Sequence, residues 1–206
     1  MSLENQIYVL EERNPHKTRK SSCLGPVDVE ALRASIALLP SEAWDRSEDY
    51  DANYNKRGAI LQANHITLKF ADRRSTPIQY FDLPAWESWK KLVSPVIDAS
   101  VAQYGYAIGI VPRAMLARLQ PRTFIPPHID GDHRGHISHK IHVPLVTNDR
   151  SFFFEDGIRH HFKVGFAYEV NNGLPHHAAN GGEGDRTHLI FEYLDRSLQV
   201  FTDPPD

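Results

Sequence analysis

Two segments in the first half of the chain have the apolar spacing of amphipathic helices. In residues 26–39, apolar side chains recur every three or four positions, which places them on one helix face. They are Val29, Leu32, Ile36 and Leu39. Pro40 would end this helix, because proline lacks a backbone N–H and clashes with the preceding turn. Residues 84–104 show the same period, with Pro95 as a candidate kink. Between the two helices, the partial alternation of residues 60–70 predicts a strand.

From residue 108 onward, short runs rich in β-branched and aromatic residues are separated by turn residues. The runs fall at 108–111, 114–119, 124–125, 140–146, 151–155, 158–164, 166–170 and 188–194. Asp156-Gly157, between two of these runs, is typical of a tight hairpin turn. The pattern favours a mainly β protein, a jelly-roll or cupin-like sandwich rather than a parallel α/β sheet. The two helices would flank this sandwich on its N-terminal side, and residues 1–25 are expected to form an irregular arm.

Composition and charge narrow the classes of protein. The 206 residues fit a single domain, 1–206, and no Pro/Gly/Ser-rich linker divides them. A net charge of -3 argues against a nucleic-acid groove or an anionic membrane partner. Cys23 is the only cysteine, which excludes an internal disulfide and argues against a cysteine-based zinc site. The chain shows no apolar leader and no run of about 20 apolar residues, so a cytoplasmic protein is expected.

Histidine is the residue type that suggests chemistry: 12 are present, and five lie between His128 and His142. His128 and Asp130, two positions apart on a strand, would point to the same side and offer a nitrogen and an oxygen to one metal ion. His176 would complete a 2-His-1-carboxylate set with an open face, the donor set of non-haem Fe(II) oxygenases. Arg186 would be able to hold a carboxylate in a bidentate fork, as an oxygenase that consumes a dicarboxylic keto acid requires. A His-X-Asp pair by itself also occurs by chance on solvated surfaces.

Three blocks of the chain carry a family resemblance. They are residues 113–130 (RAMLARLQPRTFIPPHID), 140–148 (KIHVPLVTN) and 171–191 (NNGLPHHAANGGEGDRTHLIF). In order and spacing they resemble the aspartyl/asparaginyl β-hydroxylase family of Fe(II)/2-oxoglutarate-dependent dioxygenases, over about residues 105–195. The resemblance implies a double-stranded β-helix, with a catalytic β-sandwich core at 106–195. Residues 1–105 would be a helical part that shapes the substrate side.

The same resemblance assigns roles to individual residues. His128, Asp130 and His176 take the iron-ligand positions. His176 is preferred to His177 because it has the family spacing to Arg186, and because strand alternation lets only one of the pair face the metal. Arg186 takes the position that binds the distal carboxylate of 2-oxoglutarate. Further co-substrate contacts are expected from Lys140, His142 and His188.

Two residues depart from the family pattern. Lys140 replaces a more usual arginine, and lysine supplies charge without a planar fork. Arg122 stands where the family often has glycine in a turn. Asp130 keeps the carboxylate that related halogenases lack, and its presence favours hydroxylation over halogenation.

The implied reaction is hydroxylation of an unactivated C–H bond in an amino acid, an Asp- or Asn-like peptide side chain or another small molecule. It would use Fe(II), O2 and 2-oxoglutarate, and release succinate and CO2. Two alternatives stay open. One is a cupin-like metalloenzyme, such as an isomerase or a dioxygenase without a co-substrate. The other is a non-catalytic β-sandwich binding protein. The sequence identifies neither the substrate nor the oligomeric state.

The remaining polar and aromatic residues of the β region have simpler interpretations. His133, His136 and His139 are expected in a polar loop, where they are either solvated or shape the cavity rim. The aromatic run 152–154 is interpreted as core. Asn180 is a candidate for orienting the ligand histidines.

Overall fold

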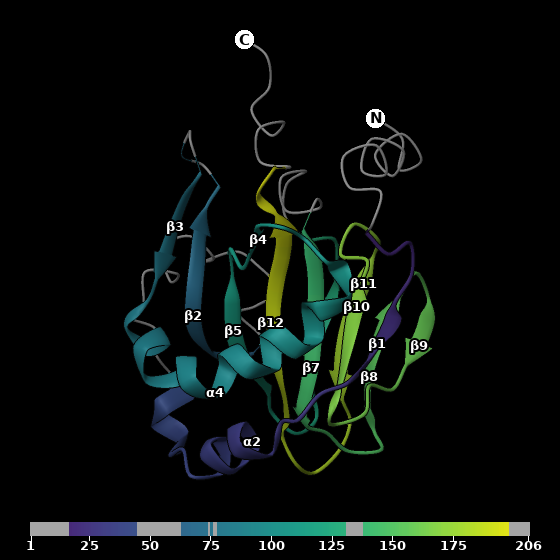
Figure 1. Ribbon diagram of the computed structural model, residues 1–206. Coiled ribbons are helices and arrows are strands. Elements are labelled where there is room, and N and C mark those ends of the chain that lie inside the picture. The colour runs from purple at the N-terminus through teal and green to yellow at the C-terminus, as the bar shows by residue number, and fades with distance from the viewer. Residues whose placement is uncertain (1–16, 45–62, 74, 76–77, 131–137, 198–206) are drawn as a thin grey trace.

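Residues 17–44, 63–73, 75, 78–130 and 138–197 are described in the computed structural model (Figure 1). The first part of the chain forms β1 (Ser22–Pro26), α2 (Glu30–Ala37), a 3-10 turn (Ser41–Trp44), β2 (Asn64–Asp72) and β3 (Gln79–Asp82). It continues with α4 (Pro84–Val101), a 3-10 turn (Ala102–Tyr104) and β4 (Gly109–Ile110). The remaining strands are β5 (Ala114–Leu119), β6 (Thr123–His128), β7 (His139–Val146), β8 (Ser151–Glu155), β9 (Ile158–His160), β10 (Phe166–Val170), β11 (His176–Asn180) and β12 (Arg186–Asp195).

The strands form two sheets, and every strand pairing described is antiparallel. The larger sheet has the order β1-β10-β7-β12-β5-β2-β3, with β4 also paired to β12. The smaller sheet has the order β6-β11-β8-β9. Strands that are distant in sequence are therefore neighbours, as in a jelly roll, and the protein is mainly β as the sequence predicted.

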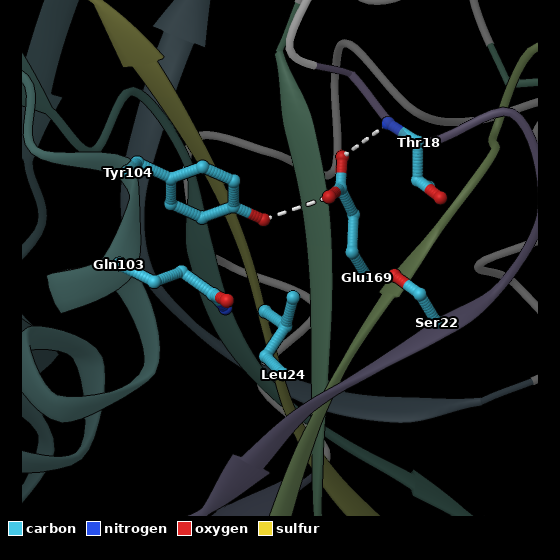
Figure 2. Close-up of a pocket in the computed structure, with 6 residues that line it drawn as sticks. All are labelled: Thr18, Ser22, Leu24, Gln103, Tyr104 and Glu169. Atoms are coloured by element: carbon cyan, nitrogen blue, oxygen red, sulfur yellow. Dashed lines mark hydrogen bonds between the residues drawn. The ribbon is translucent and has the colours of Figure 1, made fainter.

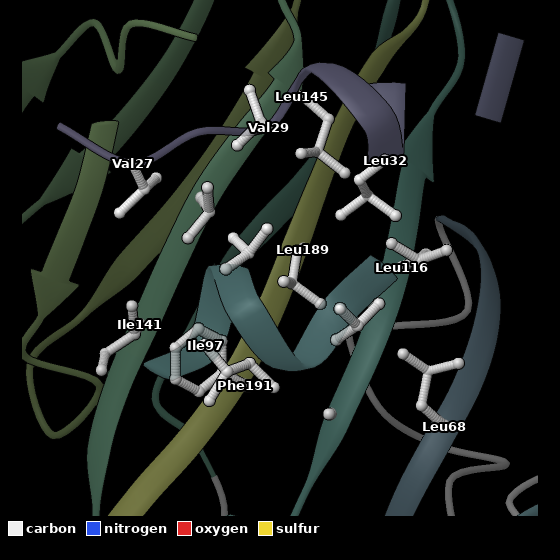
Figure 3. Packing of buried hydrophobic residues seen from close by; sticks show 14 of the residues in the cluster. Val27, Val29, Leu32, Leu68, Ile97, Leu116, Ile141, Leu145, Leu189 and Phe191 are labelled. Atoms are coloured by element: carbon white, nitrogen blue, oxygen red, sulfur yellow. The ribbon is translucent and has the colours of Figure 1, made fainter. Parts of the chain in front are cut away.

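Helices α2 and α4 cover the outer face of the larger sheet (Figure 1). Figure 3 shows Leu189 and Phe191 of β12 packed with Ile97 of α4 and Leu32 of α2. A second, smaller core joins the two sheets. It contains Leu119, Phe153, Phe162, Val170 and Ala178. The chain therefore buries one core between helix and sheet and another inside the sandwich.

The first 105 residues contribute strands as well as helices, because β1, β2 and β3 all join the larger sheet. The predicted helix at 26–39 is shorter than expected. Its first residues are used elsewhere: Pro26 ends β1, and the Val27 amide donates to the Gly165 carbonyl at 2.8 Å. The predicted helix at 84–104 is found as α4 and continues through Pro95. The part of the 60–70 strand before residue 63 lies outside the described residues.

The hairpin between β8 and β9 turns where the sequence predicted. Asp156 and Gly157 have φ values of 48° and 76°, the two positive angles of a type I′ turn. Arg122 adopts φ 57°, so this position has the left-handed conformation that a glycine would accept more readily. None of the helices in the described ranges has the length and apolar character needed to cross a membrane.

Candidate metal centre

Two neighbouring strands of the smaller sheet bring together the three predicted ligands. His128 ends β6, His176 begins β11, and the two residues are directly paired in register. Asp130 lies just beyond β6 rather than on it, and its backbone amide donates to the Asn172 carbonyl at 3.1 Å. One potential donor atom from each of His128, Asp130 and His176 lies within 4.8 Å of the other two. Chain segments far apart in the sequence thus present two imidazoles and one carboxylate at a single point.

Both ligand histidines are oriented by backbone carbonyls. The Nδ1 atom of His128 lies 2.8 Å from the Pro126 carbonyl oxygen, and that of His176 lies 2.9 Å from the Leu174 carbonyl oxygen. A carbonyl only accepts, so Nδ1 carries the proton in each ring and Nε2 keeps its lone pair. The two Nε2 atoms lie 3.6 and 3.7 Å from Asp130 Oδ1. The lone pairs that a metal needs are therefore directed toward the carboxylate.

Asn180 does not orient these rings, contrary to the prediction from sequence. Its side-chain amide donates to the carbonyls of Leu119, Gln120 and Gly184, and its oxygen accepts from Asn148 and Ser151. Asn180 thus stabilises the turn that follows β11, while the backbone carbonyls next to each histidine fix the imidazoles.

The Asp130 carboxyl is held in its anionic form. Burial alone would raise its pKa, but the Lys140 ammonium, with Nζ 3.0 Å from Oδ2, and the two histidines hold the pKa of Asp130 well below its usual range. Burial lowers the pKa of His176, so its ring is neutral at neutral pH. For His128, burial opposes protonation, but the bond to Asp130, the Pro126 carbonyl and the Asp130 charge together outweigh burial and raise the pKa. A metal cation bound at His128 Nε2, in place of a proton, would be attracted by the same Asp130 carboxylate.

The neighbouring histidine, His177, points away from the cluster. Its ring stacks on Phe154 with the centroids 4.3 Å apart and the planes 5° from parallel. Strand alternation sends His176 inward, where its ring lies 5.7 Å from that of Phe153. The geometry favours His176 as the ligand. The same alternation applies to the aromatic run 152–154, which was interpreted as core. Phe153 is in the core, but Phe152 and Phe154 are only half-buried on the outer face.

A second polar group lies deeper in the sandwich and is built from strands β7 and β12. Arg186 is only 5% exposed, and Nη2 lies 3.3 Å from Nδ1 of His188. The His188 ring meets the edge of the His142 ring at 5.7 Å, and His142 in turn lies 5.4 Å from Phe153. Arg186, His188 and His142 thus form a continuous buried group that reaches the metal-side residues through Phe153, whereas Lys140 is half-buried beside Asp130.

This inner group carries one buried cation beside two neutral rings. Burial lowers the pKa of Arg186 to about 10, which still leaves the guanidinium charged at neutral pH. Burial and then the nearby cations hold the pKa values of His142 and His188 well below their usual range. Within the described part of the chain, His142 Nδ1 and His188 Nε2 have no hydrogen-bond partner, and no carboxylate contacts Arg186. Such an arrangement is costly unless an anionic, hydrogen-bonding ligand completes it.

His139 differs from the sequence prediction. It is fully buried at the start of β7 rather than exposed on a rim, and its side chain faces the helices. Its Nδ1 lies 2.7 Å from a Glu169 carboxylate oxygen, and its Nε2 lies 2.6 Å from the Tyr106 hydroxyl. His133 and His136 lie outside the described residues.

Glu169 also accepts hydrogen bonds from the Tyr104 hydroxyl and the Thr18 amide, at 2.8 and 3.1 Å (Figure 2). These residues border a cavity of about 330 Å³. The cavity is lined by Thr18, Ser22, Leu24, Gln103, Tyr104 and Glu169. None of the three candidate metal ligands lines it, so this cavity is separate from the metal centre.

The sequence reasoning also missed Lys17. This residue comes from the segment expected to be an irregular arm, yet its ammonium donates to Ser138 O and Asn172 Oδ1, both at 2.5 Å. Burial is the main reason that the pKa of Lys17 falls to about 8. A lone lysine in a polar stretch gives no periodic or motif signal, so only the tertiary structure reveals this contact.

A jelly-roll sandwich that holds two histidines and a carboxylate at one end of its interior has the architecture of non-haem iron oxygenases. Comparison with protein families agrees. Residues 96–195 match the family model described as "Aspartyl/Asparaginyl beta-hydroxylase".

Solved structures support the fold. An oxidoreductase of the 2OG-Fe(II) oxygenase family from Burkholderia pseudomallei is 16% identical to this chain, with a TM-score of 0.50 over 82% of this chain and 91% of that one. The crystal structure of EvdMO1 is 14% identical, with a TM-score of 0.52 over 94% of this chain and 50% of that one. At these identities the similarity concerns the fold. No curated protein matches the chain.

Proposed function

We propose that the protein is an Fe(II)- and 2-oxoglutarate-dependent hydroxylase, with His128, Asp130 and His176 as the iron ligands. The observation that carries the proposal is the combination of this three-residue cluster with a buried arginine that contacts no carboxylate among the described residues. The family match supports the same reaction class.

The donor set fits iron rather than a structural metal. Two neutral imidazole nitrogens and one carboxylate oxygen, with the opposite side open, are the ligands of Fe(II) oxygenases. A structural zinc site would close its shell with four protein ligands, usually including cysteine, and the only cysteine, Cys23, is exposed on β1. Bound iron would supply the capacity to activate O2, while the protein holds and orients the reactants and excludes water.

Arg186 would anchor the far carboxylate of 2-oxoglutarate through a bidentate pair. The neutral rings of His142 and His188 would add hydrogen bonds, because each has a buried nitrogen without a partner among the described residues. Lys140 would serve two purposes: it keeps Asp130 ionised, and it provides positive charge where the near carboxylate of the co-substrate would approach.

The proposed substrate is a small polar molecule, namely an amino acid or an Asp- or Asn-like peptide side chain. Glu192 pairs in register with Lys140 on the neighbouring strand and forms an ion pair with Arg73. The charged side chains of Lys140, Glu192 and Arg73 suit a substrate that carries ammonium or carboxylate groups. It suits a purely hydrocarbon substrate poorly, because such a substrate would leave the buried charges unsolvated.

The buried arginine also separates this proposal from a cupin-like enzyme without a co-substrate. Such an enzyme would share the sandwich and the histidines but would have no use for Arg186. Its cation would then remain buried without an anion, at a substantial cost in stability.

The reaction is tested by measuring succinate formation from 2-oxoglutarate in the iron-loaded protein. The assay screens free amino acids, short Asp- or Asn-containing peptides and neutral hydrocarbon analogues of matched size. We expect succinate release to be stimulated by a member of the first two groups. The proposed substrate class would be contradicted if none of the three groups stimulates succinate release, or if only the neutral analogues do.

A further inference from the structure

Residues 17–21 make hydrogen bonds to strands β8 and β10 and to the loop 171–175, which precedes the ligand strand β11. Thr18 donates its amide to Glu169, and the Arg19 carbonyl accepts from the Asn171 side chain at 3.2 Å. Ser21 donates its amide and hydroxyl to the Glu155 carboxylate, at 2.6 and 3.0 Å. We call residues 17–21 the strap.

Lys17 forms the part of the strap nearest to Asp130. Its Nζ bonds both the Oδ1 atom of Asn172 and the carbonyl of Ser138, which precedes Lys140 by two residues. Asn172 is 1% exposed, and its own carbonyl accepts the Asp130 amide. Asn172 thus links the two residues: its side chain accepts from Lys17, and its backbone carbonyl accepts from the Asp130 amide.

The other end of the strap supports His176. Glu155 is 2% exposed and pairs in register with His176 across β8 and β11. Its carboxylate binds Ser21 and also the Asn171 amide, at 2.7 Å for the latter. The loop 171–175 is therefore fixed on both sides. This loop supplies the Asn172 carbonyl to Asp130 and the Leu174 carbonyl to His176 Nδ1.

We propose that Lys17 is a positioning residue of the metal centre, which holds the Asp130 ligand in place through Asn172. The inference rests on the proposed function only in taking Asp130 as a metal ligand. Lys17 makes no hydrogen bond to any of the three ligands, so it acts by fixing the backbone from which Asp130 projects. Residues that orient metal ligands in this way typically change metal affinity by 10- to 100-fold when they are removed.

The test compares wild type with Lys17→Met, Lys17→Arg and the control Lys20→Met. Lys20 lies in the same strap but is exposed. Two quantities are measured without oxygen or 2-oxoglutarate: the Fe(II) dissociation constant and the visible absorption spectrum of the Co(II)-loaded protein, which reports ligand geometry. We expect Lys17→Met to weaken Fe(II) binding by roughly 10- to 100-fold and to alter the Co(II) spectrum. Lys17→Arg should recover most of the affinity, and Lys20→Met should behave as wild type.

Wild-type affinity together with a wild-type Co(II) spectrum in Lys17→Met would overturn the positioning role. If Lys17→Met does not fold, Asn172→Ala tests the same link, because it removes Oδ1 but keeps the carbonyl that accepts from Asp130. An unchanged Fe(II) affinity in that variant would likewise overturn the role. Failure of the wild-type protein to bind Fe(II) would instead reject the metal centre itself, so the two failures are distinguishable.

Discussion

At the scale of single residues, the site combines two kinds of polar group with different partners. His128, Asp130 and His176 are already directed toward one another, with the imidazole tautomers fixed by backbone carbonyls. Arg186 and its two histidines are buried without an acidic partner among the described residues. The first group matches a cation and the second an anion. The structure therefore favours binding a metal and a carboxylate ligand together.

Arg186→Ala should weaken 2-oxoglutarate binding while leaving metal binding nearly intact. Losing a buried charge-assisted contact costs on the order of 2–5 kcal/mol, which corresponds to roughly 30- to 4000-fold in the dissociation constant. The measurement is anaerobic titration of the iron-loaded variant with 2-oxoglutarate. Arg122→Ala is the matched control, because Arg122 is exposed and forms its ion pair with Glu183 at the surface. An equal loss of iron and co-substrate would show that Arg186 has a different role.

Residue identities were predictable from the sequence where spacing encodes chemistry. The interval from His128 to Asp130, together with the family resemblance for His176 and Arg186, selected the three residues that the fold brings together. Lys17 and His139 were not predictable in this way. Their contacts depend on segments that meet only after folding, Lys17 with Asn172 and His139 with Glu169.

At the scale of elements, the strongly patterned segments were predicted and the weakly patterned ones were not. Helices α2 and α4 and strands β5, β7, β8, β10 and β12 follow from periodicity and β propensity. β11, which carries His176, reads HHAAN and has no β-branched residue. It is a strand because β6 and β8 pair with it on both sides, and this tertiary context overrides local propensity. β9 ends at His160, earlier than predicted, and Phe162 packs in the core between the sheets.

The β8–β9 turn allows a test of element stability apart from the metal chemistry. Gly157 has φ 76°, and a side chain at this angle costs roughly 1–2 kcal/mol. An added Cβ would meet nothing within 4 Å, so conformational strain is the only expected penalty. Gly157→Ala should therefore lower the free energy of unfolding by that amount in urea denaturation and leave Fe(II) affinity unchanged. Gly184→Ala, which has open space and no positive φ, is the control. Equal stability of the two variants would contradict the turn assignment.

At the scale of the whole molecule, two separate hydrophobic cores stabilise different parts of the fold. The helix-covered core fixes the larger sheet, including β7 and β12, and the smaller core joins that sheet to the strands that carry the histidines. The jelly-roll class was predictable from the succession of short strands. The participation of β1, β2 and β3 in the larger sheet was only partly predictable, because β1 and β3 are short edge strands with little apolar alternation.

The buried histidines make the stability of the whole protein sensitive to acid. His142, His176 and His188 have folded-state pKa values below their unfolded value near 6.5. The unfolded chain therefore binds protons first, and stability falls as the pH drops below about 6.5. Each ring contributes up to about 1.4 kcal/mol per pH unit. His128, whose pKa is raised, adds stability only as the pH falls toward 6.5 and does not offset the loss below that pH.

Urea denaturation of the metal-free protein at pH 7.5, 6.5 and 5.5 measures this dependence. We expect a decreasing free energy of unfolding and a shallower decrease in His188→Leu, which lacks one of the depressed groups. Stability that rises or stays level between pH 7.5 and 5.5 would contradict the assignment of these rings as buried and neutral.

The most direct test of the account is an anaerobic titration of the metal-free protein, first with Fe(II) and then with 2-oxoglutarate, followed by visible absorption. We predict one bound Fe(II) per chain, and a metal-to-ligand charge-transfer band that develops only when 2-oxoglutarate is added to the iron-loaded protein. Stoichiometric iron with no such band would contradict co-substrate binding at Arg186, and the absence of stoichiometric iron would contradict the metal centre formed by His128, Asp130 and His176.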